Sequence, residues 1–282
     1  MLIRTNGRGY STAPPRGMSL LVWNCRGLGN LVTKKELGDL TQAQDPSAVF
    51  IAETWMDEAR LKKIKRNLHF DHMFFVPRIN WGGGLVLYWK ESLNLIVETS
   101  SKNQIDCIIG KSREDGWRFT GFYGEPITHK RHESWDLLHQ LNNRFSLPWM
   151  WSGDFNEIVR NSEKKGGSNW SHTQMLNLRE VIDACKFIDM GYKVIPFTWK
   201  KLYRDGHLIW ERLDRSMATS DWLTRFGGSS VHHLTCSTSD HSPLLILPEV
   251  LVTTIPKKPF HFEEMWLVEK GCSDTVNSEW GK

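Results

Sequence analysis

The sequence lacks the residue patterns of several common protein classes. Its five cysteines are odd in number and scattered, and no two form a Cys-x-x-Cys pair. This argues against a disulfide framework and a structural zinc site, and indicates a reducing compartment. There is also no His-Glu-x-x-His motif, no Walker A loop and no serine or cysteine nucleophile elbow. Chemistry that depends on those motifs is not expected.

Long apolar runs are also missing. No stretch approaches the length of a membrane span, so we expect a soluble, non-secreted chain with no membrane partner. The net charge of +4 on 282 residues tolerates a polyanionic partner without requiring one. With 40% hydrophobic residues and 14 tryptophans, the chain can bury a sizeable core.

The two ends of the chain differ in composition from its middle. No acidic residue precedes Glu36, and the arginines before it resemble a transit peptide weakly. A flexible leader over residues 1–18, which contain two adjacent prolines, is the interpretation we favour. Composition changes again after Pro248. We therefore expect one folded domain over residues 19–248 and a tail over 249–282.

Short apolar runs alternate with helical periodicity within that domain. Helices are expected to begin at the capping box Thr33-x-x-Glu36, after Asp57, near Trp135 and after Ser171. The expected strands are 19–23, 48–52, 73–76, 85–89, 93–97, 105–110, 117–123, 149–152, 194–199, 209–217, 231–234 and 244–247. Because many strands form adjacent pairs, the pattern predicts two sheets packed together with helices outside.

Polar side chains follow several of these strands directly, where loops on a rigid scaffold usually carry function. Each alone has an ordinary explanation as a turn residue, a cap or an ion pair. Their joint placement at strand ends predicts a shared site. The residues are Asn24, Glu53, Asp154, Asn156, Asp214, Asp240 and His241.

Metal-assisted phosphodiester hydrolysis needs this set of groups. Hard divalent ions take carboxylate oxygens and water, so Glu53 and Asp240 are the predicted ligands of Mg²⁺, with Mn²⁺ as the alternative and Asn24 as a neutral neighbour. Asp154 is the predicted base that deprotonates a water molecule, and Asn156 would hold it in place.

The remaining two residues, His241 and Asp214, would face the negative charge that develops on the phosphate. We expect a protonated His241 to contact the phosphoryl oxygens, with its charge and orientation set by Asp214.

Seven motifs give the chain a family resemblance. LLVWNCRGLGN, IAETW, FTGFYGEP, WSGDFNEI, PFTW, ERLDR and SDHSPLLI occur in this order over about residues 19–247. The chain resembles the endonuclease/exonuclease/phosphatase superfamily, and more narrowly the apurinic-type endonuclease domain of plant LINE-type (non-LTR) retrotransposons.

That resemblance implies a four-layer α/β sandwich, with two mostly antiparallel mixed β-sheets packed face to face and helices outside. It implies the same roles for the polar residues above and adds Tyr123 as a contact to the scissile phosphate. It further implies DNA as the partner and an endonuclease that nicks one strand. We expect a monomer located in the nucleus, where the DNA is, although no clear nuclear signal is present and the cytoplasm is the alternative.

Two features differ from the cellular apurinic endonucleases, and a third, the tail, extends the resemblance. Those enzymes place an acid two residues after the first Asn, where this chain has Arg26, a residue that the LINE-type branch shares. The Asn that often follows the Tyr-x-Pro element has no counterpart in YGEPIT. The tail resembles the lead-in to a reverse transcriptase, which is absent from this chain, so we expect an isolated domain, a truncated element or a partial gene model.

A basic hairpin is expected between PFTW and ERLDR. Asp205-Gly206 is a tight-turn signal for a two-stranded ribbon. Lys200, Lys201, Arg204 and His207 would lie at its tip and contact DNA. An ordinary solvated hairpin is the alternative.

Two other functions remain open from the sequence. A small-molecule or phospholipid phosphoesterase of the same superfamily would use the same catalytic groups. A non-catalytic nucleic-acid-binding remnant of a retroelement is the second alternative, although every expected catalytic side chain is present.

Overall fold

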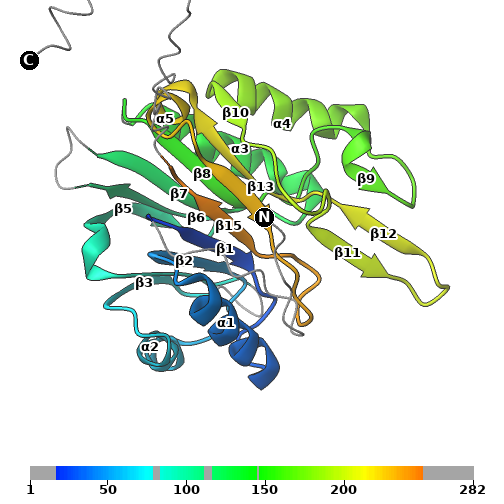
Figure 1. Ribbon diagram of the computed structural model, residues 1–282. Coiled ribbons are helices and arrows are strands. Elements are labelled where there is room, and N and C mark those ends of the chain that lie inside the picture. Colours follow the sequence, from blue (N-terminus) through cyan, green and yellow to red (C-terminus); the bar gives the residue numbers. More distant parts are fainter. Residues whose placement is uncertain (1–16, 79–82, 111–115, 145, 250–282) are drawn as a thin grey trace, which may run out of the picture. The chain divides into compact units, whose positions relative to one another are not determined.

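The computed structural model describes residues 17–249, except 79–82, 111–115 and 145. Residues 1–16 of the predicted leader and 250–282 of the predicted tail lie outside the described residues. The described part forms two six-stranded sheets, a small three-stranded sheet and surrounding helices (Figure 1).

The first sheet has the strand order β14-β15-β1-β2-β4-β3. Its parallel pair is β1 with β2, and the other neighbours are antiparallel. The strands are β1 (Leu20–Asn24), β2 (Ala48–Ala52), β3 (His72–Val76), β4 (Leu85–Trp89), β14 (Ser230–His233) and β15 (Leu244–Leu247).

The second sheet has the strand order β10-β13-β8-β7-β6-β5. Here β7 and β8 are parallel, and the other neighbours are antiparallel. The strands are β5 (Leu95–Ser101), β6 (Gln104–Ile109), β7 (Trp117–Tyr123), β8 (Trp149–Asp154), β10 (Phe187–Asp189) and β13 (Asp214–Thr219). A separate sheet contains β9 (Lys164–Lys165), β11 (Trp199–Leu202) and β12 (Leu208–Glu211).

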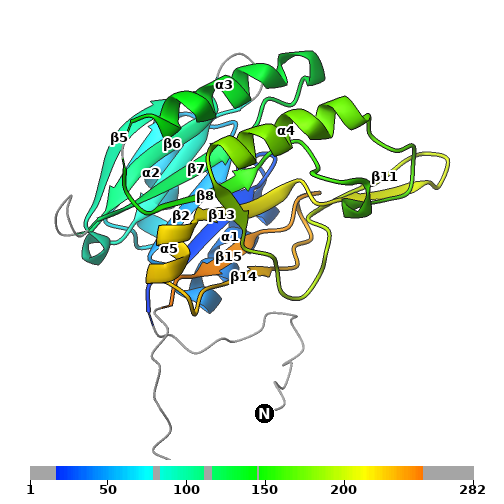
Figure 2. The same ribbon diagram turned by 90° about the horizontal axis from the view of Figure 1, so that it is seen from above.

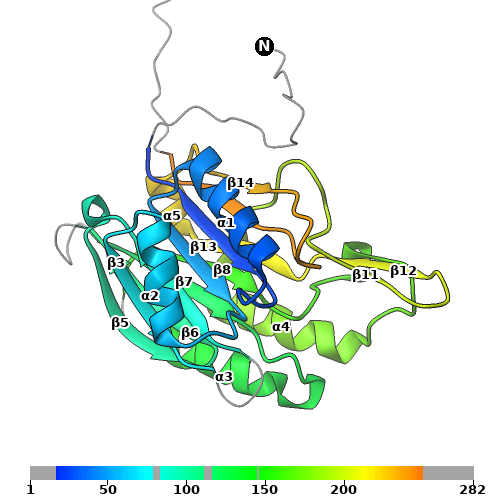
Figure 3. The ribbon, with the colours of Figure 1, turned by 90° about the horizontal axis from the view of Figure 1, so that it is seen from below.

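Alternating side chains decide how these sheets pack. Leu20 and Val22 of β1 belong to the apolar cluster between the two sheets, together with side chains of β7 and β8. Leu21 and Trp23 point the other way, into the cluster under α1 (Leu31–Gln44) and α2 (Glu58–Asn67). The first sheet is therefore covered on both faces, and Figure 3 shows α1 and α2 on its outer side.

The second sheet is covered in the same way. Trp149 and Trp151 of β8 pack against Leu138 of α3 (Arg131–Asn142) and Leu178 of α4 (His172–Ala184). Figure 2 shows these two helices lying across that sheet. A short helix, α5 (Ser220–Arg225), follows β13. The result is the predicted four-layer α/β sandwich of two mixed sheets with helices outside.

Several local predictions are confirmed and others are wrong. Asp57 and Ser171 cap α2 and α4 through their side chains. The capping box at Thr33 is wrong: α1 begins at Leu31, and Asn30 is its cap. Glu36 instead accepts hydrogen bonds from Ser237 and Thr238, a contact far away in sequence.

Three strand predictions are also wrong in their extent. In place of the predicted strand 93–97, β5 begins at Leu95 and continues to Ser101. The segment 209–217 is two strands, β12 and β13, which belong to different sheets. The segment 194–199 is mostly irregular, and β11 begins only at Trp199. The spacing of Trp135, Leu138, Leu141 and Phe145 predicts the third helix, and the last of these residues, Phe145, lies outside the described residues. Among the described helices, none combines the length and apolar character needed to cross a bilayer.

Candidate active site

Strand register brings three of the predicted residues side by side. Tyr123 at the end of β7 is paired with Asp154 at the end of β8, and Asp154 is paired with Asp214 at the start of β13. All three side chains are buried. Because β7 and β8 are parallel, their carboxyl ends lie at the same end of the second sheet, and the antiparallel β13 begins at that end.

The first sheet contributes its own parallel strand ends at the same place. Asn24 ends β1, and Glu53 directly follows β2. The side-chain amide of Asn24 donates to Glu53 Oε1 and to Asp154 Oδ2, each at 2.9 Å. Tyr123 also donates from its hydroxyl to Glu53 Oε1 at 2.9 Å. Asn24 therefore links strand ends of the two sheets by hydrogen bonds.

Two matching turns hold these polar groups. The backbone N–H of Arg26 donates to Asn24 Oδ1 at 3.2 Å, and the backbone N–H of Asn156 donates to Asp154 Oδ1 at 2.8 Å. Arg26 and Asn156 both have left-handed backbones, with φ of 46° and 52°. Glu53 also does, with φ of 53°. Non-glycine residues in this region are uncommon and concentrate at functional sites.

His241 comes from the loop before β15 and completes the group. Its Nδ1 lies 2.8 Å from Asp214 Oδ2, and its Nε2 lies 3.8 Å from Asp154 Oδ2. The backbone carbonyl of His241 accepts from Trp23 Nε1 at 3.0 Å. His241 thus reaches the second sheet while its backbone is held by the first.

Burial and neighbouring charge shift the titration of this group. Burial raises the pKa of Asp154 to about 6, although His241 opposes the shift. Burial acts against protonation of His241, but the carboxylates of Asp214 and Asp154 outweigh it and raise the pKa of His241 to about 10. Burial and the nearby Glu53 raise the pKa of Tyr123 far above its usual value. At neutral pH the site therefore contains a carboxylate, an imidazolium and a neutral phenol.

The carboxylates of Glu53 and Asp240 both face one cation, the Arg26 guanidinium. Arg26 Nη1 lies 2.9 Å from Asp240 Oδ2, and Arg26 Nε lies 3.9 Å from Glu53 Oε2. Asp240 Oδ1 is buried and has no hydrogen-bond partner among the described residues. Two carboxylates that face a positive group, one of them with an oxygen that lacks a partner, are suitable ligands for a hard divalent ion. Asp154, Asp214 and His241, whose ligand atoms lie within 4.8 Å of one another, are a second group that could hold a metal.

Sequence reasoning missed several residues that hold the site. Trp199 Nε1 donates to Asp240 Oδ2 at 3.0 Å, and Ser239 Oγ donates to the Asn24 carbonyl at 2.9 Å. The Thr198 hydroxyl accepts from the Asp214 N–H at 2.8 Å. Thr198, Trp199 and Ser239 stand in the PFTW and SDHSPLLI motifs, which was the available signal. Nothing local indicated the contact of Arg26 with Asp240.

The predicted ribbon is present as β11 and β12, which extend away from the two main sheets in Figure 1. The tight turn expected at Asp205-Gly206 is confirmed: the Tyr203 N–H donates to the His207 carbonyl at 2.8 Å, the Gly206 N–H donates to the Tyr203 carbonyl at 3.0 Å, and Gly206 has a φ of 85°. The predicted place at the tip is wrong for Lys200 and Lys201, which lie on β11, whereas Arg204 and His207 lie at the turn. All four are exposed. The ribbon adjoins the site, because the Lys200 N–H donates to the Asp240 carbonyl at 3.0 Å.

A cavity of about 250 Å³ lies where the ribbon meets the site. Phe197, Trp199 and Trp210 line it together with Lys200 and Asp240. Aromatic walls beside a carboxylate suit a flat ring or a sugar.

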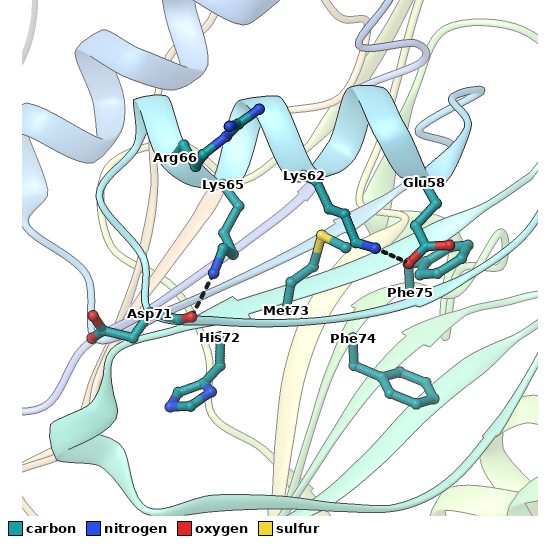
Figure 4. Close-up of a pocket in the computed structure, with 9 residues that line it drawn as sticks. All are labelled: Glu58, Lys62, Lys65, Arg66, Asp71, His72, Met73, Phe74 and Phe75. Atoms are coloured by element: carbon teal, nitrogen blue, oxygen red, sulfur yellow. Dashed lines mark hydrogen bonds and ion pairs between the residues drawn. The ribbon is translucent and has the colours of Figure 1, made fainter.

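A larger cavity of about 710 Å³ lies between α2 and β3 (Figure 4). Lys62 and Lys65 there bond Glu58 and the Asp71 carbonyl at 2.7 and 2.6 Å. It contains none of the predicted site residues.

A family comparison agrees with this arrangement. The model of the endonuclease/exonuclease/phosphatase family matches residues 21–241, which include every buried residue of the site. The chain belongs to this family. It is thus related to phosphoester hydrolases that include both nucleases and phosphatases. No curated protein matches the sequence.

Solved structures show the same fold at low sequence identity. The AP endonuclease LMAP from Leishmania major has a TM-score of 0.66 at 17% identity, over 88% of this chain and 92% of that one. The 3'-5' exonuclease NExo from Neisseria meningitidis has a TM-score of 0.65 at 13% identity, over 82% and 100%. The endonuclease domain of TRAS1, a telomere-specific non-LTR retrotransposon, has a TM-score of 0.61 at 13% identity, over 83% and 99%.

Proposed function

We propose that this member of the family is a divalent-metal-dependent phosphodiesterase that nicks one strand of DNA, as a retrotransposon-type endonuclease. The observation that carries the proposal is that strand ends of both sheets bring five polar side chains together. These are Asn24, Glu53, Asp154, Asp214 and His241. We propose residues 19–248 as the catalytic domain and the nucleus as its place of action.

Asp154 is the proposed base. Its raised pKa of about 6 leaves it ionised at neutral pH yet basic enough to take a proton from water. The Asn156 N–H and the Asn24 amide hold its two oxygens, so its orientation is set before substrate binds. Attack by the activated water on phosphorus would then release the leaving oxygen of the broken strand.

His241 and Tyr123 are the proposed contacts to the phosphate. The imidazolium offers a hydrogen bond from Nε2, while Asp214 holds Nδ1. Tyr123 stays neutral and can donate from its hydroxyl. Both would stabilise the negative charge that develops on the phosphoryl oxygens.

Glu53 and Asp240 are the proposed holders of Mg²⁺, or of Mn²⁺, with Asn24 beside them. When bound, the ion would neutralise phosphate charge and stabilise the leaving oxygen. Oxygen donors are the ligands that both ions prefer, and Asp240 Oδ1 is without a partner among the described residues.

DNA is the proposed substrate because of what surrounds the site. Lys200, Lys201, Arg204 and His207 place exposed basic groups on the adjoining ribbon. The aromatic cavity beside Asp240 suits a base or sugar. The structural relatives named as endonucleases and an exonuclease favour the same substrate class.

Supercoiled plasmid tests the proposal. Purified protein with Mg²⁺ should convert it to open circles, and Asp154→Ala and His241→Ala should each abolish that product. Intact plasmid across several metals and salt concentrations would refute the endonuclease. Faster phosphate release from inositol phosphates would favour a small-molecule phosphatase, whereas a mobility shift without nicking would favour a binding remnant.

A further inference from the structure

Arg26 has an unusual position for a basic residue. It lies two residues after Asn24, in a left-handed backbone conformation that directs its N–H to the Asn24 side chain. Its guanidinium lies between Asp240, at 2.9 Å, and Glu53, at 3.9 Å. These carboxylates are the two that we propose as metal holders.

The two carboxylates keep their positions by other contacts. Glu53 Oε1 accepts from Asn24 and Tyr123, and Asp240 Oδ2 accepts from Trp199. Glu53 Oε2 faces the Arg26 guanidinium, and Asp240 Oδ1 has no hydrogen-bond partner among the described residues. If the guanidinium moved away, the two oxygens that it faces, Glu53 Oε2 and Asp240 Oδ2, would therefore remain in position.

Movement of Arg26 is physically easy. Its side chain is 45% exposed, and ion pairs at that exposure contribute little to stability because water and salt screen them. A guanidinium and a divalent ion have the same sign of charge, however, and repel each other strongly within a few ångströms in a partly buried pocket. The two cations cannot share these carboxylates.

We propose that Arg26 is a tethered competitor of the metal ion. Its guanidinium neutralises Glu53 and Asp240 while the ion is absent, and it must rotate toward solvent before the ion binds. The affinity of the site for divalent ions is then set by this exchange. The inference rests on the proposed function, which supplies the metal role of the two carboxylates.

Manganese binding to the full chain tests this exchange without using activity. Free Mn²⁺ is measured by electron paramagnetic resonance during titration of wild-type protein and of Arg26→Met, which removes the charge without adding an oxygen ligand. We expect the Kd for Mn²⁺ to fall by about tenfold or more in Arg26→Met. Arg26→Lys keeps the charge and should stay close to wild type. The matched control Arg66→Met removes an exposed charge at the far end of α2 and should leave the Kd unchanged.

The outcomes separate the two proposals. Equal Mn²⁺ affinity in wild type and Arg26→Met would overturn the role of Arg26 and leave metal-assisted hydrolysis standing. Absence of Mn²⁺ binding in both proteins would overturn the metal site itself, and with it the proposed hydrolysis. Adding Glu53→Gln to Arg26→Met should abolish the gain. Retained tight binding there would place the ion elsewhere and refute the inference.

Discussion

His241 Nδ1 lies 2.8 Å from Asp214 Oδ2, and both side chains are only 3% exposed. With water excluded, the carboxylate determines the charge and the orientation of the ring. The other ring nitrogen, Nε2, is turned toward Asp154, the proposed base. Asp214 therefore stabilises a positive charge on His241 beside the place where the phosphate would lie.

Asp214→Asn should separate that electrostatic role from packing. The amide has the same shape but no charge, so the imidazolium loses its main support and the nicking rate should fall about 100-fold or more. Initial rates on supercoiled plasmid measure this. Asp57→Asn is the control, since asparagine caps a helix as well as aspartate does and α2 should be unaffected. A rate within threefold of wild type for Asp214→Asn would contradict the assigned role.

Glu36→Gln should loosen the loop that carries Asp240 and His241. The Glu36 carboxylate accepts hydrogen bonds from the N–H and hydroxyl groups of both Ser237 and Thr238. An amide can accept fewer of these, so the free energy of unfolding should fall by roughly 2 kcal/mol. Nicking should slow as well.

Urea unfolding measures the change in stability for Glu36→Gln. Glu58→Gln is the control, because its surface ion pair with Lys62 should contribute less than about 1 kcal/mol. Equal unfolding midpoints for Glu36→Gln and wild type would show that the loop does not depend on this contact.

His233 should make the protein less stable in mild acid. Burial lowers the pKa of His233 to about 4 from the ordinary 6.5, and Arg212 adds to the shift. At pH 7 both the folded and unfolded states are neutral at this residue. Below pH 6.5 the unfolded state binds a proton at His233 that the folded state does not bind. The free energy of unfolding therefore falls as the pH is lowered to about 4, and then levels off. The loss is about 3 kcal/mol for a shift of this size.

Comparison of wild type with His233→Gln isolates that contribution. The free energy of unfolding is measured in urea at pH 7.5, 5.5 and 4.5 for both proteins. The wild type should lose more stability than the variant over this range, although the variant starts lower because its packing against Tyr192 is weakened. Parallel curves would show that His233 titrates normally in the folded protein.

The exposed ribbon should contribute DNA affinity rather than chemistry. Replacing Lys200, Lys201 and Arg204 together with Gln should weaken binding of duplex DNA. If each contacts one phosphate, the log–log salt dependence should become shallower by up to about 2.7, since each contact contributes about 0.9. Fluorescence anisotropy at several salt concentrations measures both effects. The control removes the same charge from the cavity beside β3, in Lys62, Lys65 and Arg66.

A full loss of nicking at saturating DNA in the ribbon variant, with unchanged affinity, would assign the ribbon to catalysis. Unchanged affinity and unchanged salt dependence would make it an ordinary solvated hairpin.

Some of this structure could be predicted from local patterns. The runs LLVW and AVFIA are apolar at every position because β1 and β2 are covered on both faces. Asp57 and Ser171 were identified as caps because capping depends on a few neighbouring residues. The boundary between β12 and β13 was missed because apolar and polar residues continue across it, and only the partner strands differ.

The amino-acid sequence by itself determined that Asn24, Glu53 and Asp154 stand at strand ends, because strand position and turn chemistry are local properties there. Tertiary structure alone decided what those groups contact. Arg26 meets Asp240 across 214 residues, and Glu36 meets Ser237 across 201. Such contacts depend on which strands become neighbours and at which register, and that choice is made by burial of the whole core rather than by any short segment.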